Sequence, residues 1–147
     1  MLMSQLQQER LVVGVGSVAS CRRAVDDTIN YVKERKAFGK RIADFQNTQF
    51  KLAELSTEVE IGRVFVDKLC ASHVEGEDIV TEVSGAKYWT TDLQKKVTAE
   101  CLQLHGGYGF MKEYPIAMDY ADAAVQSIYA GTNEIMKVII SRRLGLG

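Results

Sequence analysis

Proline is almost missing from this chain: Pro115 is the only one among 147 residues. Because proline removes a backbone donor and clashes with the preceding turn of a helix, long helices are permitted nearly everywhere else. Strand patterns are also scarce, since the β-branched runs at 12–13 and 138–140 both lie within helical patterns. These absences favour an all-α protein, and the length favours one domain.

Other absences restrict the function. No apolar run approaches the roughly 20 residues of a membrane-spanning helix. The 18 basic and 19 acidic residues nearly balance, so we expect neither nucleic acid nor an anionic membrane as partner. Cys21, Cys70 and Cys101 are distant and odd in number, which favours free thiols in the cytoplasm, or the mitochondrial matrix in a eukaryote. His73 and His105 form no metal-binding pair with nearby residues, so no metal site is expected.

Hydrophobic residues recur at helical spacing over three long segments. We predict helices over 3–35, from an N-cap at Asp44 to about Gly76, and over 79–105. In the second helix the apolar positions are alternately three and four residues apart, which is typical of a packing seam in a bundle. That seam comprises Phe45, Thr48, Leu52, Leu55, Val59, Gly62, Val66 and Leu69.

Two shorter helices follow. Pro115 can occupy the first turn of a helix over 115–125, and Thr132 is a suitable N-cap for the last helix. The predicted fold is therefore an antiparallel up-down four-helix bundle with a short extra helix. Taken alone, this pattern favours a helical interaction or structural module.

Three glycine-containing breaks separate the helical segments, at 34–39, 103–109 and 128–135. Such breaks leave free backbone N–H groups at helix ends, which suits an anionic or carbonyl-bearing ligand. Arg35 lies in the first break, and Gln103 precedes a Gly-Gly pair in the second. Together they indicate a large phosphate-bearing cofactor lying across the helix ends.

The order, spacing and residues of these breaks, with Glu-Arg-Leu at 9–11 and Phe-Gln at 45–46, resemble the C-terminal domain of the acyl-CoA dehydrogenases. The resemblance covers 8–144, and the run at 131–137 is most similar to the long-chain members. It implies that residues 1–147 form the C-terminal helical domain of an FAD-dependent enzyme. The family's N-terminal helical and middle β-domains are expected to lie outside this sequence, so the chain alone should be inactive.

In this family a carboxylate removes the α-proton of an acyl-CoA thioester, and the β-hydrogen leaves as hydride to FAD. Many members place that carboxylate before the Gly-Thr of the last motif, where this sequence has Ala130. The isovaleryl- and long-chain-like members place it in a Glu-Arg-Leu sequence, so the resemblance implies Glu9 as the catalytic base. Arg10 matches an arginine beside the active site, and Tyr129 and Gly131 match contacts to the thioester end of the substrate.

The resemblance also implies cofactor contacts from two subunits. Arg35 matches a residue that binds the FAD pyrophosphate of a neighbouring subunit, as a guanidinium can. Gln103 and Gly107 match residues that hold the adenine end of the neighbour's FAD, Phe38 matches a position near the adenosine half, and Gln46 and Gly106 match further cofactor contacts. Thr132 and Glu134 match contacts to the cofactor of the same subunit. A homodimer or homotetramer is therefore expected, with electron-transfer flavoprotein as the acceptor.

Two other functions stay open at this point. One is a non-catalytic helical module that retains only the family's oligomerisation surface. The other is an oxygen-using relative, similar to acyl-CoA oxidase or nitroalkane oxidase. Measuring bound flavin would separate the first from the enzyme.

Overall fold

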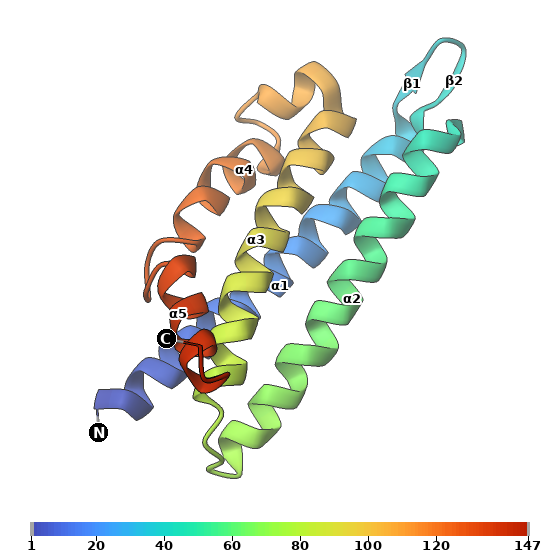
Figure 1. The fold of residues 1–147 in the computed structure, drawn as a ribbon. Helices are drawn as coiled ribbons and strands as arrows, with labels where there is room; N and C mark the ends of the chain where they lie inside the picture. The colour runs from blue at the N-terminus through green and yellow to red at the C-terminus, as the bar shows by residue number, and fades with distance from the viewer. Residues whose placement is uncertain (1, 147) are drawn as a thin grey trace.

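Three long helices lie side by side and give the molecule its elongated shape (Figure 1). The computed structural model describes residues 2–146, with side chains from residue 5 onward. The long helices are α1 (Leu2–Glu34), α2 (Gln46–Val74) and α3 (Val80–His105). The shorter α4 (Pro115–Gln126) and α5 (Asn133–Arg143) follow one another along α3 and complete the bundle (Figure 1). The all-α prediction is confirmed.

Helix α3 is the centre of the bundle, because it packs against all four other helices. The predicted seam of α2 is buried at Leu55, Val59, Val66 and Leu69, although Leu52 is only half-buried. Gly62 belongs to this seam because a Cβ there would lie 3.1 Å from the Trp89 ring. The regular spacing of α2 therefore corresponds to one continuous packing face.

The connection between α1 and α2 differs from the prediction. It contains a small hairpin, β1 (Lys36–Ala37) and β2 (Lys40–Arg41), followed by a short 3-10 turn at Ile42–Asp44. The N-cap prediction for Asp44 is wrong, since α2 begins one residue beyond Phe45. The physical reason is Arg41: its backbone N–H and its guanidinium both donate to the Asp44 carboxylate, at 3.1 and 2.7 Å.

The other predicted helix boundaries agree with the structure. Gly76 has a φ of 79° just beyond α2, and Pro115 opens α4. The hydroxyl of Thr132 accepts a hydrogen bond of 3.4 Å from the Ile135 backbone N–H, as expected of an N-cap. All three cysteines are free.

The described residues contain neither a membrane-spanning helix nor a cluster of metal ligands. None of their helices combines the length and hydrophobicity that crossing a bilayer requires. Their His, Cys, Asp and Glu side chains form no cluster that could hold a metal ion.

Candidate functional site

Glu9 lies in a hollow of about 610 Å³ between α1 and the loop that joins α4 to α5. Its side chain is exposed, and no described residue forms an ion pair or hydrogen bond with its carboxylate. The carboxylate is therefore free to contact a ligand in the hollow. The residues that line it are Gln5, Gln8, Glu9, Val12 and Val13 from α1, and Tyr129 and Ala130 from the loop.

The loop opposite Glu9 has an unusual backbone. Ala130 has a φ of 55° and Gly131 a φ of 93°, so two consecutive residues occupy the left-handed side of conformational space. Glycine is favoured at 131 because side chains rarely adopt a φ of 93°, and an added Cβ would also lie 2.8 Å from Cε of Met136. These angles turn the chain sharply from α4 into α5 and place Ala130 at the rim of the hollow.

Arg10 holds this loop from the α1 side. Its side chain is buried, and its Nε donates to the backbone carbonyl of Ala130 at 3.4 Å. Burial lowers the pKa of Arg10, while the neighbouring Glu9 acts in the opposite sense. The structure shows Arg10 in contact with the loop that carries Tyr129, and the substrate contact stays a prediction.

A second hollow of about 440 Å³ continues the first along α1 and α4. Val12, Val13 and Tyr129 line both hollows, so the two hollows form one groove. Its far end is polar: the side chains there are Ser20, Arg23, Gln94 and Asp119. From Glu9 to Ser20 the groove follows α1 for roughly 16 Å, given the rise of a helix.

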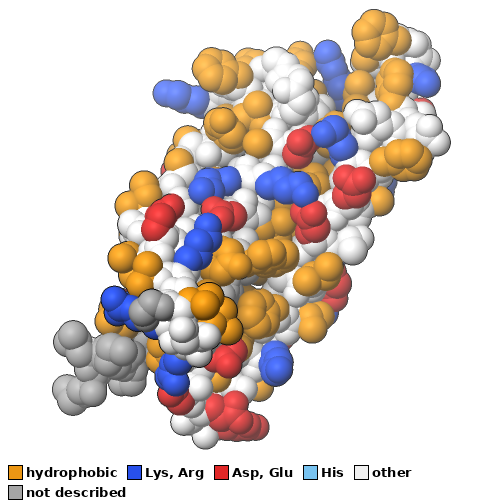
Figure 2. Space-filling model, in the orientation of Figure 1, with side chains coloured by type: hydrophobic (Ala, Val, Ile, Leu, Met, Phe, Trp, Pro, Cys, Tyr) orange, Lys and Arg blue, Asp and Glu red, His pale blue; other side chains and the backbone are white. Residues whose placement is uncertain are grey.

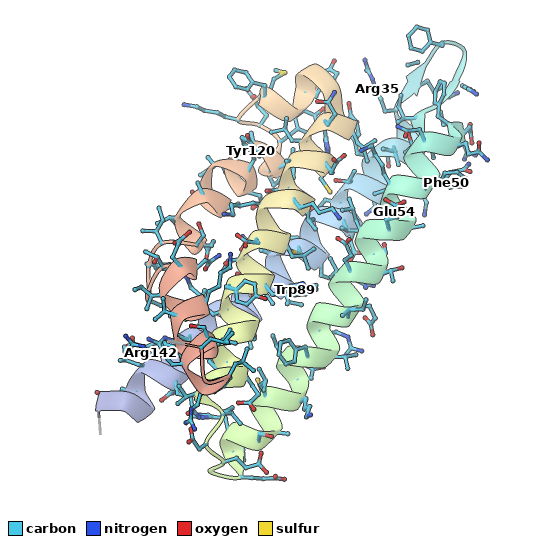
Figure 3. All side chains as sticks on the ribbon, in the orientation of Figure 1. Arg35, Phe50, Glu54, Trp89, Tyr120 and Arg142 are labelled. Atoms are coloured by element: carbon cyan, nitrogen blue, oxygen red, sulfur yellow. The ribbon has the colours of Figure 1, made fainter. Side chains whose placement is uncertain are left out.

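A second group of predicted site residues lies at the hairpin end of the bundle. The Arg35 guanidinium stacks over the Tyr108 ring at 4.9 Å and has no ion pair among the described residues. Phe38, at the hairpin tip, is 95% exposed. Gln46 is exposed at the first turn of α2. Figure 3 shows Arg35 beside the hairpin, far from Arg142 on α5.

The end of α3 completes this second group. Gln103, Gly106 and Gly107 are all exposed there, and Gly106 has a φ of 60°. A Cβ added at Gly107 would meet nothing within 4 Å, so the backbone is open to a ligand. An unpaired guanidinium, an exposed aromatic ring and an open glycine backbone suit the phosphates and rings of a dinucleotide. The residues at this end therefore fit FAD.

The structure thus separates the predicted residues into two groups. Glu9 and Arg35 lie 26 positions apart along α1, which corresponds to roughly 39 Å in a helix. Around Glu9 the structure brings together Arg10, Tyr129 and Gly131, and Thr132 and Glu134 follow at the start of α5. At the hairpin end lie Arg35, Phe38, Gln46, Gln103, Gly106 and Gly107.

Glu134 is engaged with its own helix start. Hydrogen bonds from its own backbone N–H and from the Thr132 hydroxyl lower the pKa of Glu134. A carboxylate in this place also interacts favourably with the positive end of α5. The Glu134 carboxylate therefore contributes to the cap of α5, and its cofactor contact stays a prediction.

Two residues near the groove were missed by the sequence reasoning. Lys87 on α3 is fully buried and reaches the α4–α5 loop, and Asn133, the first residue of α5, is also buried. One available signal was the position of Lys87 next to Ala86, which forms a hydrophobic stripe with Val83 and Leu93 in the predicted 79–105 helix. A lysine beside such a stripe is more often at the edge, with its charge in water.

Comparison with known proteins gives consistent matches over nearly the whole chain. Residues 1–145 match the family model described as "Acyl-CoA dehydrogenase, C-terminal domain". The mitochondrial long-chain specific acyl-CoA dehydrogenase of Mus musculus is 50% identical over 143 residues, which cover 97% of this chain and 33% of that protein. Subunit CarC of the caffeyl-CoA reductase–Etf complex of Acetobacterium woodii is 37% identical, over 97% of this chain and 38% of that protein.

A solved structure agrees with these matches. The crystal structure of an acyl-CoA dehydrogenase from Geobacillus kaustophilus superposes with a TM-score of 0.96 and 54% identity, over 99% of this chain and 38% of that one. The chain therefore spans between a third and two fifths of the length of these relatives.

Proposed function

Since this chain belongs to the acyl-CoA dehydrogenase family and matches its C-terminal domain, we propose that it works as part of a flavoenzyme that oxidises fatty acyl-CoA to trans-2-enoyl-CoA. The observation that carries the proposal is the placement of Glu9 across a hollow from Tyr129 and Ala130, with no hydrogen bond or ion pair between its carboxylate and a described residue. Ala130 cannot take a proton, so Glu9 is the carboxylate available at this end of the groove.

In the proposed mechanism a carboxylate oxygen of Glu9 accepts the α-proton of the thioester. Tyr129 and Gly131 border the position of the thioester, while Arg10 fixes the loop through the Ala130 carbonyl. When bound, FAD supplies the acceptor for the β-hydrogen, which leaves as hydride. At the other end of the bundle, Arg35 would donate to the phosphate oxygens of a neighbouring subunit's FAD, and Phe38, Gln46, Gln103, Gly106 and Gly107 would help to hold it. Thr132 and Glu134 would contact the cofactor of the same subunit.

A hybrid protein tests the proposal, with this chain replacing the matching third of the mouse long-chain enzyme. The purified hybrid should retain FAD and lose flavin absorbance when mixed anaerobically with hexadecanoyl-CoA. A folded hybrid that holds FAD and is not reduced would contradict the proposal and favour the non-catalytic module. Reoxidation by oxygen alone, as fast as by electron-transfer flavoprotein, would favour the oxidase-like alternative.

The part of the groove at Val12, Val13 and Gly16 is apolar and suits an acyl chain, and Gly16 offers a direct test. Gly16 lines the second hollow, and a Cβ there would meet nothing within 4 Å. In the hybrid, Gly16→Leu should slow flavin reduction by hexadecanoyl-CoA about tenfold, equivalent to about 1.4 kcal/mol, because the side chain obstructs the groove. Reduction by butyryl-CoA should change less than about twofold.

The matched control for Gly16 is Ala71→Leu, a small exposed residue near the end of α2 that lies outside the groove. It should leave both rates unchanged. If Gly16→Leu slows both substrates equally, the second hollow does not hold the acyl chain.

We also propose a homodimer or homotetramer. Apolar side chains remain uncovered at Val15 on α1 and at Ile61 and Val64 on α2. Figure 2 shows hydrophobic side chains alternating with charged ones over α2 and α3. Exposed apolar surface of this kind favours association.

The proposed electron acceptor is an electron-transfer flavoprotein. The name of the Acetobacterium relative places that protein in a complex with Etf, which supports the choice. The cytoplasm, or the mitochondrial matrix in a eukaryote, is the compartment that fits such a partner and the free cysteines.

A further inference from the structure

Lys87 is a fully buried cation in the centre of the bundle. Its Nζ donates to the backbone carbonyl of Gly131 at 2.7 Å and to Oδ1 of Asn133 at 3.0 Å. No carboxylate forms an ion pair with it among the described residues. Burial lowers the pKa of Lys87, and the nearby charge of Arg10 acts in the same sense. Burial of an ammonium group costs free energy unless hydrogen bonds compensate for its lost hydration. The groups that accept hydrogen bonds from Lys87 therefore indicate its role.

Those acceptors belong to the loop that faces Glu9. Arg10 from α1 binds the carbonyl of Ala130, and Lys87 from α3 binds the carbonyl of Gly131. Two consecutive carbonyl groups are thus held by cations from two different helices. All peptide bonds of the described chain are trans, so the N–H of Thr132 points away from Lys87. The orientation of both peptide groups is therefore fixed from outside the loop.

Asn133 extends this network to the start of α5. Its side-chain amide group donates to the backbone carbonyl of Tyr88 at 3.2 Å and to the Asp92 carboxylate at 3.0 Å. Its Oδ1 accepts from the Thr91 hydroxyl at 3.2 Å as well as from Lys87. The first turn of α5 is therefore attached to α3 at several points, and Lys87 joins this attachment to the loop.

We propose that Lys87 is a positioning residue, which sets the distance between the 129–132 loop and Glu9 and thereby aligns the substrate α-carbon with the base. The inference rests on the proposed function. Lys87 does not line the groove and acts only through the loop. Small displacements of a reacting group can lower rates by about 100-fold, so a loop released by one missing cation should have a measurable effect.

The first test needs no cofactor. Amide hydrogen exchange of the chain should show that Lys87→Met raises exchange at 127–135 by about tenfold, the change that roughly 1.4 kcal/mol of lost local stability produces. Thr98→Val is the matched control: Thr98 is also fully buried in α3, and its hydroxyl donates to the Gln94 carbonyl of the same helix. It should not change exchange at 127–135. Equal exchange at 127–135 in Lys87→Met and the parent, or a uniform rise over all helices, would overturn the proposal.

The second test uses the hybrid enzyme. Lys87→Met should slow flavin reduction at saturating hexadecanoyl-CoA by about 10- to 100-fold. FAD content should be unchanged and the Kd for acyl-CoA should change less than about threefold, because none of the side chains that line the groove is substituted. Lys87→Arg keeps a cationic donor and should recover part of the rate. A parental rate in folded Lys87→Met would overturn the proposal.

A second variant covers the case in which Lys87→Met does not fold. Lys87→Gln remains polar but is too short to reach the Gly131 carbonyl, so the same rise in exchange and the same loss of rate are expected. Parental exchange and rate in Lys87→Gln would then overturn the proposal. A parental hybrid that is never reduced would instead contradict the proposed function, and the exchange result would be unaffected.

Discussion

Replacing Glu9 by glutamine in the hybrid enzyme should slow flavin reduction by about 10²- to 10⁴-fold, the usual loss when a general base is removed. Glutamine has nearly the shape of glutamate but cannot accept the α-proton at neutral pH. The Glu9 carboxylate has no described hydrogen-bonding partner, so the substitution should not change the melting temperature or the FAD content. Stopped-flow mixing with acyl-CoA under anaerobic conditions measures the rate.

Glu54→Gln provides the matched control for this experiment. Glu54 is an exposed glutamate on α2, outside the groove (Figure 3). Its substitution removes the same charge and should leave the rate unchanged. If Glu9→Gln reduces flavin as fast as the parent, Glu9 is not the base and the proposed site is wrong at its centre.

Adding Ala130→Glu to the Glu9→Gln hybrid should raise the reduction rate again by about tenfold or more, as a displaced but competent base would. Ala130 lines the same hollow as Glu9 from the opposite side, so a carboxylate there can face the same α-carbon. Ala130 already has a φ of 55°, and the alanine-to-glutamate change adds little backbone strain. Imperfect geometry should leave the rate below that of the parent and alter the preferred chain length.

The control for this recovery is Ala130→Gln in the same Glu9→Gln background. It introduces a side chain of equal size without a base and should recover no activity. If both double variants are equally slow, then Ala130 does not face the α-carbon across the groove.

The helices were predictable because their signals are local. The three- and four-residue spacing of α2 requires only a sequence window, and its buried positions Leu55, Val59, Val66 and Leu69 agree with it. Thr132 likewise caps α5 through a residue three positions away. The motifs of the three breaks also identified the family, which the comparisons confirmed.

The roles of individual site residues are less visible in the sequence. The motifs named Glu9 and Arg10 as neighbours with related functions, yet Glu9 is exposed in the groove and Arg10 is buried against the loop. Successive residues of a helix point in different directions, so whether each side chain is exposed or buried depends on which helices surround α1. The separation of the Arg35 group from the Glu9 group also follows from the length of α1, once α1 is known to be one unbroken helix.

The sequence by itself determined the helical periodicity, most helix boundaries and the family, because each depends on nearest neighbours or on short motifs. The tertiary structure alone decided that Asp44 bonds Arg41 rather than capping α2, and that Lys87 is buried under the loop. Lys87 and Gly131 are 44 positions apart, and their contact exists only because α5 packs against α3. A lysine carries the same charge in any sequence, but burial and the carbonyl groups brought to it by distant segments decide what that charge does.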